Sequence, residues 1–240
     1  MPRGGLYKSI DVWMYRGRLT DDDKQHDVEE SMYLSRLILN SYSRAVQRDL
    51  ASPHDMHRTV MRGFPENLDD HKERILYRLD QMERGDQLCL LVQSQLEPDW
   101  TQLDPTYLAQ VDMDNPALKQ FDPQPVNGQR FTFRLRANPT RRPGKRAGDD
   151  KGKRVGLYKI DEQIQWLNRK AESGGFLVES VLPTQQHRAD DRKRDLKFLS
   201  VRFDGVLRVT DAVPFASILA NGIGSGKAFG FGLLSVARAE

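Results

Sequence analysis

Two histidines stand three residues apart in a segment whose pattern predicts a helix. Ser52 can cap its start and Pro53 suits the first helical position, so the helix would run to about Arg62. This spacing places His54 and His57 on one helix face. Imidazole changes its charge near neutral pH and is the usual side chain for moving protons there. The pattern indicates general acid–base chemistry, and two solvated surface histidines are the alternative.

A glycine-rich stretch near the end of the chain offers a different chemistry. Gly222–Ser235 holds several glycines and one lysine, Lys227. Glycine allows the backbone to turn its N–H groups toward an anion, so Gly224 and Ser225 could approach a phosphate beside the lysine. A mononucleotide P-loop is excluded, because Ala228 follows the lysine and no helix-length segment remains. The alternative to a phosphate-binding loop is a tight turn that leads into a last strand.

Positive charge is concentrated between Arg130 and Arg154, where only Asp149 and Asp150 oppose it. An almost purely cationic stretch is typical of contact with a polyanion, whereas an ordinary solvated loop mixes both signs. RNA is favoured by the fold expected below, although the aromatic-rich RNP1 pattern is absent. The candidate RNA contacts here are Arg134, Arg136, Arg141, Arg142, Lys145, Arg146, Lys151, Lys153 and Arg154.

The elements that must position these residues fall into two similar halves. In the first half, strands are predicted at 33–39, 74–79 and 87–94, helices at 52–62 and about 105–110, and a possible fourth strand after the second helix. In the second half, strands are predicted at 130–137, 176–182, 196–203, 206–210 and from 229, with helices from about 161 to 173 and at 213–220. Asp204-Gly205 is a strong hairpin signal between two of these strands. The strand at 130–137 alternates apolar and arginine residues, which gives it one apolar and one cationic face.

Each half therefore reads βαββαβ, and the simplest architecture is an α+β protein with two tandem ferredoxin-like domains. Residues 32–118 form the first domain, with the histidine helix. A segment rich in proline and turn residues, 119–129, is the expected linker, and 130–240 form the second domain. Residues 1–31, which carry a net charge of −2 and no coherent apolar period, are treated as an N-terminal extension of uncertain order.

Composition narrows the class of protein. The 240 residues are 38% hydrophobic and 30% charged with a net charge of +3, and no apolar run approaches the ~20 residues of a membrane span. The only cysteine, Cys89, lies in an apolar run and is expected to pack as a small hydrophobe. These features predict a cytoplasmic protein. His-x-x-His supplies only two metal ligands, and no cysteine pair or H-E-x-x-H pattern supplies more, so neither a metal nor another cofactor is expected.

Four separated motifs together resemble the CasE family, the CRISPR RNA endoribonucleases of the type I-E Cascade complex. The resemblance covers essentially all of residues 32–240, in order. The motifs are Met32–Leu37, Arg48-Asp49-Leu50 ahead of Pro53–Arg58, Phe133–Pro139, and Gly222–Gly224 with the tail to Ser235. The resemblance implies metal-independent cleavage of precursor CRISPR RNA beside the repeat hairpin, leaving a 2′,3′-cyclic phosphate and a 5′-hydroxyl. It also implies that the cleaved RNA stays bound and that other Cascade subunits are partners.

The resemblance also suggests roles for residues. His57 occupies the position of the family's catalytic histidine, and Arg58 and Arg62 could supply positive charge to the transition state. His54 stands where the family often has tyrosine, so the division of acid and base between the two histidines stays open. A non-catalytic subunit that binds the RNA hairpin is the main alternative. A protein-interaction module would account for the fold but not for the basic stretch.

Overall fold

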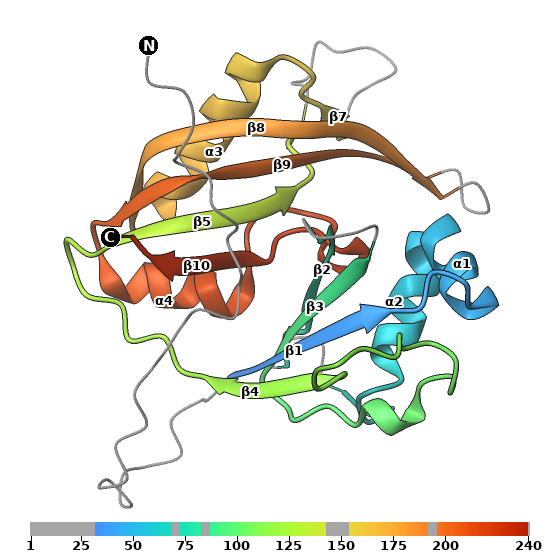
Figure 1. Ribbon diagram of the computed structural model, residues 1–240. Helices are drawn as coiled ribbons and strands as arrows, with labels where there is room; N and C mark the ends of the chain where they lie inside the picture. Colours follow the sequence, from blue (N-terminus) through green and yellow to red (C-terminus); the bar gives the residue numbers. More distant parts are fainter. Residues whose placement is uncertain (1–31, 69–72, 83–86, 143–153, 192–195, 240) are drawn as a thin grey trace, which may run out of the picture.

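The computed structural model describes residues 32–68, 73–82, 87–142, 154–191 and 196–239 (Figure 1). Two four-stranded antiparallel sheets dominate it, with the strand orders β2-β3-β1-β4 and β10-β5-β9-β8. When the four strands of each sheet are numbered 1 to 4 along the chain, both sheets have the order 4-1-3-2. The expected pair of ferredoxin-like domains is therefore confirmed. No helix in the described ranges combines the length and the apolar character needed to cross a membrane.

The first sheet contains β1 (Met32–Leu39), β2 (Leu76–Gln81), β3 (Leu88–Ser94) and β4 (Ala117–Phe121). One of its faces packs against two consecutive helices, α1 (Arg44–Ala51) and α2 (Pro53–Met61). The strands β1, β2 and β3 and the helix α2 were predicted within about two residues. The short helix α1 was not predicted.

The segment that leads to β4 differs from the prediction. The expected helix at 105–110 is wrong. A short 3₁₀ helix, η1 (Trp100–Gln102), lies earlier, and the later backbone pairs with the end of β1, where Ala109 N donates to Ile38 O at 2.9 Å. β4 crosses the expected end of the first domain at residue 118. The side chain of Asn115 anchors its approach, since it accepts from Ile38 N at 2.8 Å and donates to Ile38 O at 2.9 Å.

The second sheet contains β5 (Arg130–Ala137), β8 (Phe176–Asp191), β9 (Leu196–Val209) and β10 (Leu234–Arg238). The helices α3 (Ile160–Ser173) and α4 (Ala212–Asn221) contribute to a single hydrophobic core with the inward side chains of this sheet. A small strand pair, β6 (Thr140–Arg141) and β7 (Val155–Gly156), and a 3₁₀ helix, η3 (Lys227–Phe229), complete the domain. β5 has its predicted bounds, whereas β10 begins five residues later than predicted because η3 comes first.

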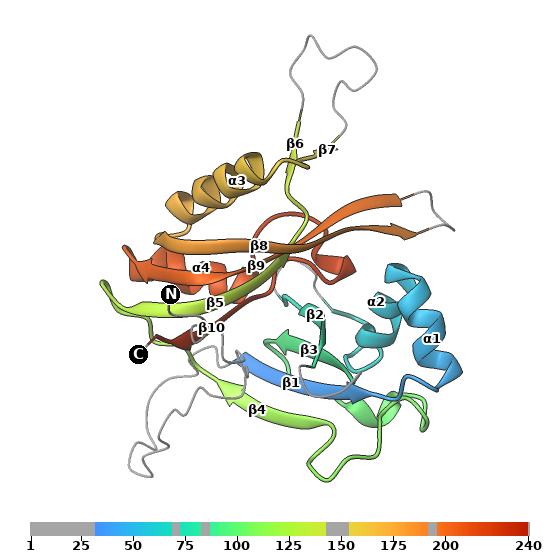
Figure 2. The ribbon, with the colours of Figure 1, turned by 45° about the horizontal axis from the view of Figure 1, so that its top comes forward.

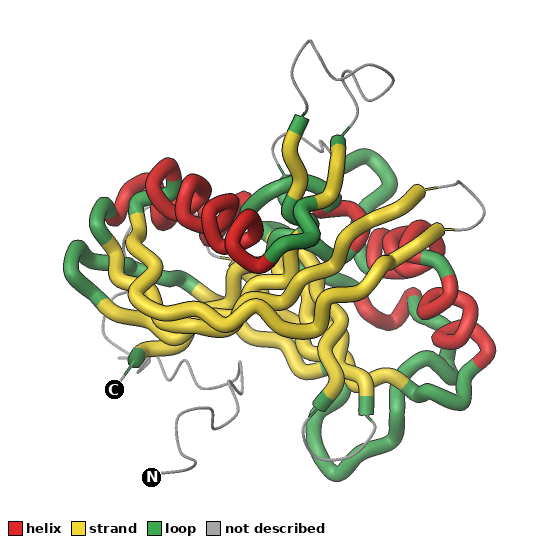
Figure 3. Tube along the Cα trace, turned by 90° about the horizontal axis from the view of Figure 1, so that it is seen from above, coloured by secondary structure: helices red, strands yellow, loops and turns green. Residues whose placement is uncertain are grey.

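The ends of β8 and β9 extend beyond their own domain toward the helices of the first one. Figures 1 and 2 show both strands continuing past the end of β5 toward α1 and α2, and Figure 3 shows the same approach from above. β8 contacts α2 directly. The first domain therefore contacts the second through this strand pair, in addition to contacts through the glycine-rich loop and between the two sheets.

The hairpin predicted at Asp204-Gly205 is wrong, because β9 runs through both residues without interruption. Gly205 pairs with Phe133 on one side and Val181 on the other. A Cβ atom at this glycine would collide with the carbonyl oxygen of Ser180 and approach the Phe133 ring to 2.9 Å. Glycine is present here because it allows close packing of the strands.

Gly205→Ala is expected to destabilise the second domain by about 1–3 kcal/mol, because an inserted methyl group forces backbone shifts in a packed sheet. Denaturant unfolding of the purified protein measures this change. An alanine variant as stable as the original chain would show that β8 can move away without cost, contrary to the packing described.

Candidate active site and nucleic-acid interface

The histidine helix α2 begins as its sequence predicts. Ser52 caps it by accepting a hydrogen bond from Asp55 N at 3.2 Å, and Pro53 occupies its first turn. Met56 and Val60 are buried against the first sheet, which fixes the rotation of the helix. This rotation leaves His54 and His57 partly exposed.

His57 rests on an aromatic side chain of the neighbouring sheet. Its ring stacks on that of Tyr77 from β2, with centroids 6.4 Å apart and planes 16° from parallel. Tyr77 is 2% exposed, and burial raises the pKa of its phenol, so the hydroxyl stays protonated and acts as a hydrogen-bond donor. The sequence alone does not single out Tyr77, because only the position of β2 in the sheet brings it into contact with the histidine.

The glycine-rich loop also contacts Tyr77. The Tyr77 hydroxyl donates to the carbonyl oxygen of Ala228 at 2.8 Å, and η3 packs against both α2 and β2. Phe229 of η3 contacts Phe198 of β9 with ring centroids 4.7 Å apart. Two motifs that lie about 170 residues apart in the sequence therefore meet around one tyrosine.

The backbone of this loop presents N–H groups. Gly224 and Gly226 have φ values of 82° and 81°, which only glycine adopts readily. Among the described residues, the N–H groups of Gly224, Ser225, Gly226 and Lys227 donate to no backbone carbonyl. Backbone segments that combine right-handed and left-handed conformations form concavities whose N–H groups bind anions. The loop thus has the geometry expected of a phosphate site.

Arg58 and Arg62 lie together but on a different side of α2 from His57. With Arg48 of α1, Asp55 and Thr59 they line a cavity of about 200 Å³, which neither histidine borders. Arg58 is 65% exposed and its Nη1 lies 3.9 Å from the Asp55 carboxylate. Positive charge therefore gathers beside the histidine face, with a contribution from Arg48 that the sequence analysis did not assign.

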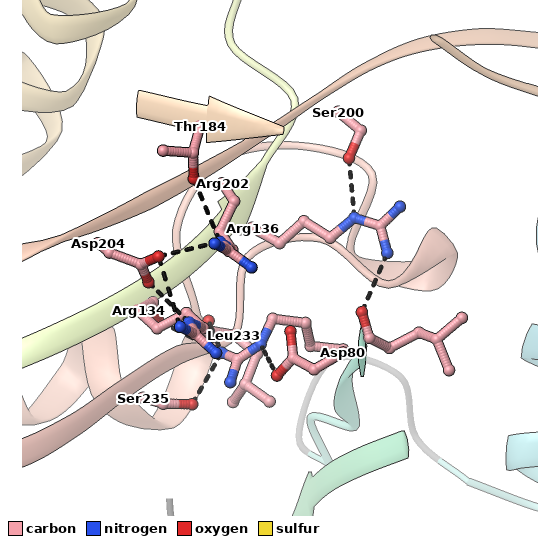
Figure 4. A network of polar contacts seen from close by, with 11 residues as sticks. Asp80, Arg134, Arg136, Thr184, Ser200, Arg202, Asp204, Leu233 and Ser235 are labelled. Carbon is pink, nitrogen blue, oxygen red and sulfur yellow. Dashed lines mark hydrogen bonds and ion pairs between the residues drawn. The ribbon is translucent and has the colours of Figure 1, made fainter. Parts of the chain in front are cut away.

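Arg134 and Arg136 point into the protein (Figure 4). The Nε of Arg134 lies 2.6 Å from Asp204 Oδ1, and its side chain is 15% exposed. Arg136 donates to Ser200 Oγ at 2.8 Å, and its guanidinium lies over the Phe231 ring at 5.6 Å. The sequence predicted RNA contacts for both arginines, but in the structure their guanidinium groups have partners within the protein.

A buried arginine joins the two sheets at the same place. Arg78 of β2 is fully buried, and its Nε donates to Asp80 Oδ2 at 2.7 Å. Its Nη1 donates to Ser235 Oγ of β10 at 2.8 Å and lies 3.4 Å from the carbonyl oxygen of Leu233. This side chain fixes the end of β10, and with it the glycine-rich loop, against β2.

The remaining basic candidates cluster at the β6–β7 pair. Arg141 pairs with Val155, so Arg141, Arg142 and Arg154 lie close together at the base of this pair, and all three are exposed. Lys145, Arg146, Lys151 and Lys153 lie outside the described residues. Within the described ranges, no three His, Cys, Asp or Glu side chains converge in a way that could hold a metal ion.

The fold and the site define a class: a tandem ferredoxin-like protein in which a histidine helix of one domain faces a glycine-rich loop of the other. Residues 32–238 match the model of the family described as CRISPR associated protein. The chain belongs to this family, and its resemblance to CasE proteins is confirmed.

Known relatives agree with this membership. The chain is 41% identical over 220 residues to the CRISPR-associated endoribonuclease Cse3 of Thermus thermophilus, covering 86% of this chain and 100% of that protein. It is 33% identical over 215 residues to the Cascade subunit CasE of Escherichia coli, covering 86% and 99%. A structure of the Thermus Cse3 bound to an RNA representing a pre-cleavage complex matches with 39% identity, a TM-score of 0.78, and coverage of 87% and 100%.

Proposed function

We propose that this protein is an endoribonuclease that cleaves precursor CRISPR RNA at the repeat hairpin and keeps the product bound as a Cascade subunit. One observation carries the proposal: the His57 ring stacks on Tyr77 and the Tyr77 hydroxyl donates to the glycine-rich loop, so a candidate proton-transfer group and a candidate phosphate-binding backbone meet at one tyrosine. The family membership and the RNA-bound Thermus Cse3 structure support RNA as the ligand.

The proposed reaction needs no group outside the RNA and the protein. The 2′-oxygen attacks the adjacent phosphorus while a base removes its proton, the P–O5′ bond breaks, and an acid protonates the departing 5′-oxygen. The products carry a 2′,3′-cyclic phosphate and a 5′-hydroxyl. His57 performs one proton transfer, and His54, whose side chain is 25% exposed on the same helix, is placed to perform the other.

Charge develops on the phosphate during this reaction, and nearby donors that are already oriented stabilise it. The N–H groups of Gly224 to Lys227 supply such donors on the loop side. Arg58 and Arg62 supply positive charge on the helix side, together with Arg48. Arg141, Arg142 and Arg154 are exposed at the β6–β7 pair and hold the RNA farther from the reacting phosphate.

The decisive experiment is cleavage of the organism's own repeat RNA in excess EDTA. Because imidazole groups carry the proton transfers, the rate is expected to be unchanged by the chelator, and mass spectrometry should find cyclic-phosphate and 5′-hydroxyl ends. Loss of cleavage that returns on addition of Mg²⁺ would contradict metal independence. Tight binding of the RNA without cleavage would instead identify a hairpin-binding subunit.

The proposal extends to the setting of the protein. The relative from Escherichia coli is named as a Cascade subunit, which supports other Cascade subunits as partners of this chain. We place the complex in the cytoplasm, where the single cysteine, Cys89, would remain a reduced thiol.

A further inference from the structure

Three cationic residues lie on the glycine-rich loop and on the segments that pack against it. Lys227 belongs to the loop itself and begins η3. A Cβ atom on Gly224 would lie 3.0 Å from the Trp166 ring of α3, and Lys170 follows that tryptophan by one helical turn on the same face. A Cβ atom on Gly222 would lie 2.9 Å from Leu76, two residues after Arg74. The loop thus contacts α3, which carries Lys170, and the start of β2, which Arg74 precedes by two residues.

Among the described residues, none of Arg74, Lys170 and Lys227 forms an ion pair, although ion pairs hold most of the other interior arginines of the two sheets. The Nε of Arg74 is buried and has no hydrogen-bond partner among the described residues. Partial burial lowers the pKa of Lys227, and the charges of Arg74 and Lys170 lower it further. Like charges held together in a partly desolvated place are unfavourable until an anion joins them.

We infer that Arg74, Lys170, Lys227 and the N–H groups of the Gly224–Lys227 backbone form one binding site for a single phosphodiester group, shared by both domains. The site rests on the proposed function for the identity of its ligand, an RNA backbone phosphate. It adds two residues, Arg74 and Lys170, that neither the glycine-rich pattern nor the basic stretch contains. Because it spans the domain boundary, RNA bound there also fixes the loop relative to α2.

The number of phosphates bound can be measured from the salt dependence of RNA affinity. Each phosphate that a protein neutralises contributes about 0.7–0.9 to the slope of log Kd against log salt concentration. Lys227→Gln is expected to weaken binding of the repeat RNA about tenfold at low salt and to lower this slope by about one. Adding Arg74→Gln and Lys170→Gln should lower the slope no further, because all three side chains serve the same phosphate.

The matched control is Arg169→Gln, which removes the same charge from the residue next to Lys170 on the exposed side of α3. It should leave the slope unchanged. A triple variant that loses about three units of slope would show three separate phosphate contacts, and variants that keep the original slope would show none; either result overturns the shared site. Thermal unfolding of each variant separates loss of the site from loss of the fold.

The site can be tested apart from the proposed function. The ¹⁵N resonance of the Lys227 ammonium should shift when inorganic phosphate is added to the protein without RNA, and this shift should be lost in Arg74→Gln. If the protein binds no repeat RNA but the phosphate-dependent shift is present, the proposed function fails and the anion site stands. If the Lys227 ammonium resonance does not shift when phosphate is added, or shifts equally in Arg74→Gln, the proposed phosphate site is wrong.

The same geometry predicts a division between binding and chemistry. Lys227→Ala is expected to weaken RNA binding more than it slows cleavage of RNA that is already bound, because the lysine belongs to the proposed phosphate site and His57 carries the proposed proton transfer. Single-turnover rates at saturating protein, compared with Kd values, measure both effects. A rate loss at saturation that exceeds the loss of affinity would place Lys227 in the chemical step.

Discussion

Replacing His57 with alanine is expected to slow cleavage of the repeat RNA by about 10²–10⁴-fold, the range that one positioned acid or base contributes. The affinity for RNA should stay close to that of the original protein, because the phosphate-binding groups lie on the loop and on other faces of α2. Single-turnover cleavage at saturating protein measures the first quantity, and filter binding at fixed salt measures the second.

His54→Ala is the informative companion, since both histidines project from α2 and only His57 stacks on Tyr77. A comparable loss of rate in His54→Ala would indicate that the pair divides acid and base between them. A small loss would indicate that another group serves the second proton transfer. Cleavage at the original rate in His57→Ala would remove the proposed mechanism altogether.

Arg78→Met is expected to destabilise the protein by about 3–5 kcal/mol, because it leaves the Asp80 carboxylate without the partner that compensates its partial burial. The same change removes the donor to Ser235 Oγ and so weakens the attachment of β10 to β2. The two domains are then expected to unfold in separate steps. Denaturant unfolding followed by circular dichroism measures both the loss of stability and the number of transitions.

Arg130→Met is the matched control, because Arg130 pairs with Glu179 at 2.8 Å and its side chain is 54% exposed. A solvent-exposed pair contributes about 0.2–1 kcal/mol, so this variant should remain near the original stability. If both variants lost similar amounts of stability, the burial of Arg78 would not be the reason that its interaction stabilises the protein. A single sharp transition in Arg78→Met would show that other contacts suffice to couple the domains.

Local sequence determined the elements whose signals come from neighbouring residues. The cap at Ser52 and the proline after it define the start of α2, since a side-chain oxygen and a fixed φ act within one turn. The alternation of phenylalanine, leucine and arginine defines β5, because successive side chains of a strand point to opposite faces. The histidine pair and the glycine-rich loop were recognised for the same reason, from spacing alone.

Other features were decided by residues far away in the chain. Asp204-Gly205 has the local preference of a turn, yet it lies inside β9 because Asp204 binds Arg134 and the missing side chain of Gly205 admits the backbone of β8. β4 is extended because Asn115 bonds to β1. In both cases the long-range contacts outweigh the local preference, which is at most about 1 kcal/mol.

The site itself shows the same division. The sequence by itself determined which groups carry chemistry: the two histidines of α2, the glycine-rich loop with Lys227, and the basic stretch. Only the tertiary structure decided that Tyr77 contacts both His57 and the loop, and that Arg134 and Arg136 turn inward. The physical reason is that a local sequence pattern determines on which face of its helix or strand a side chain lies. The packing of the two sheets determines which residues that face contacts.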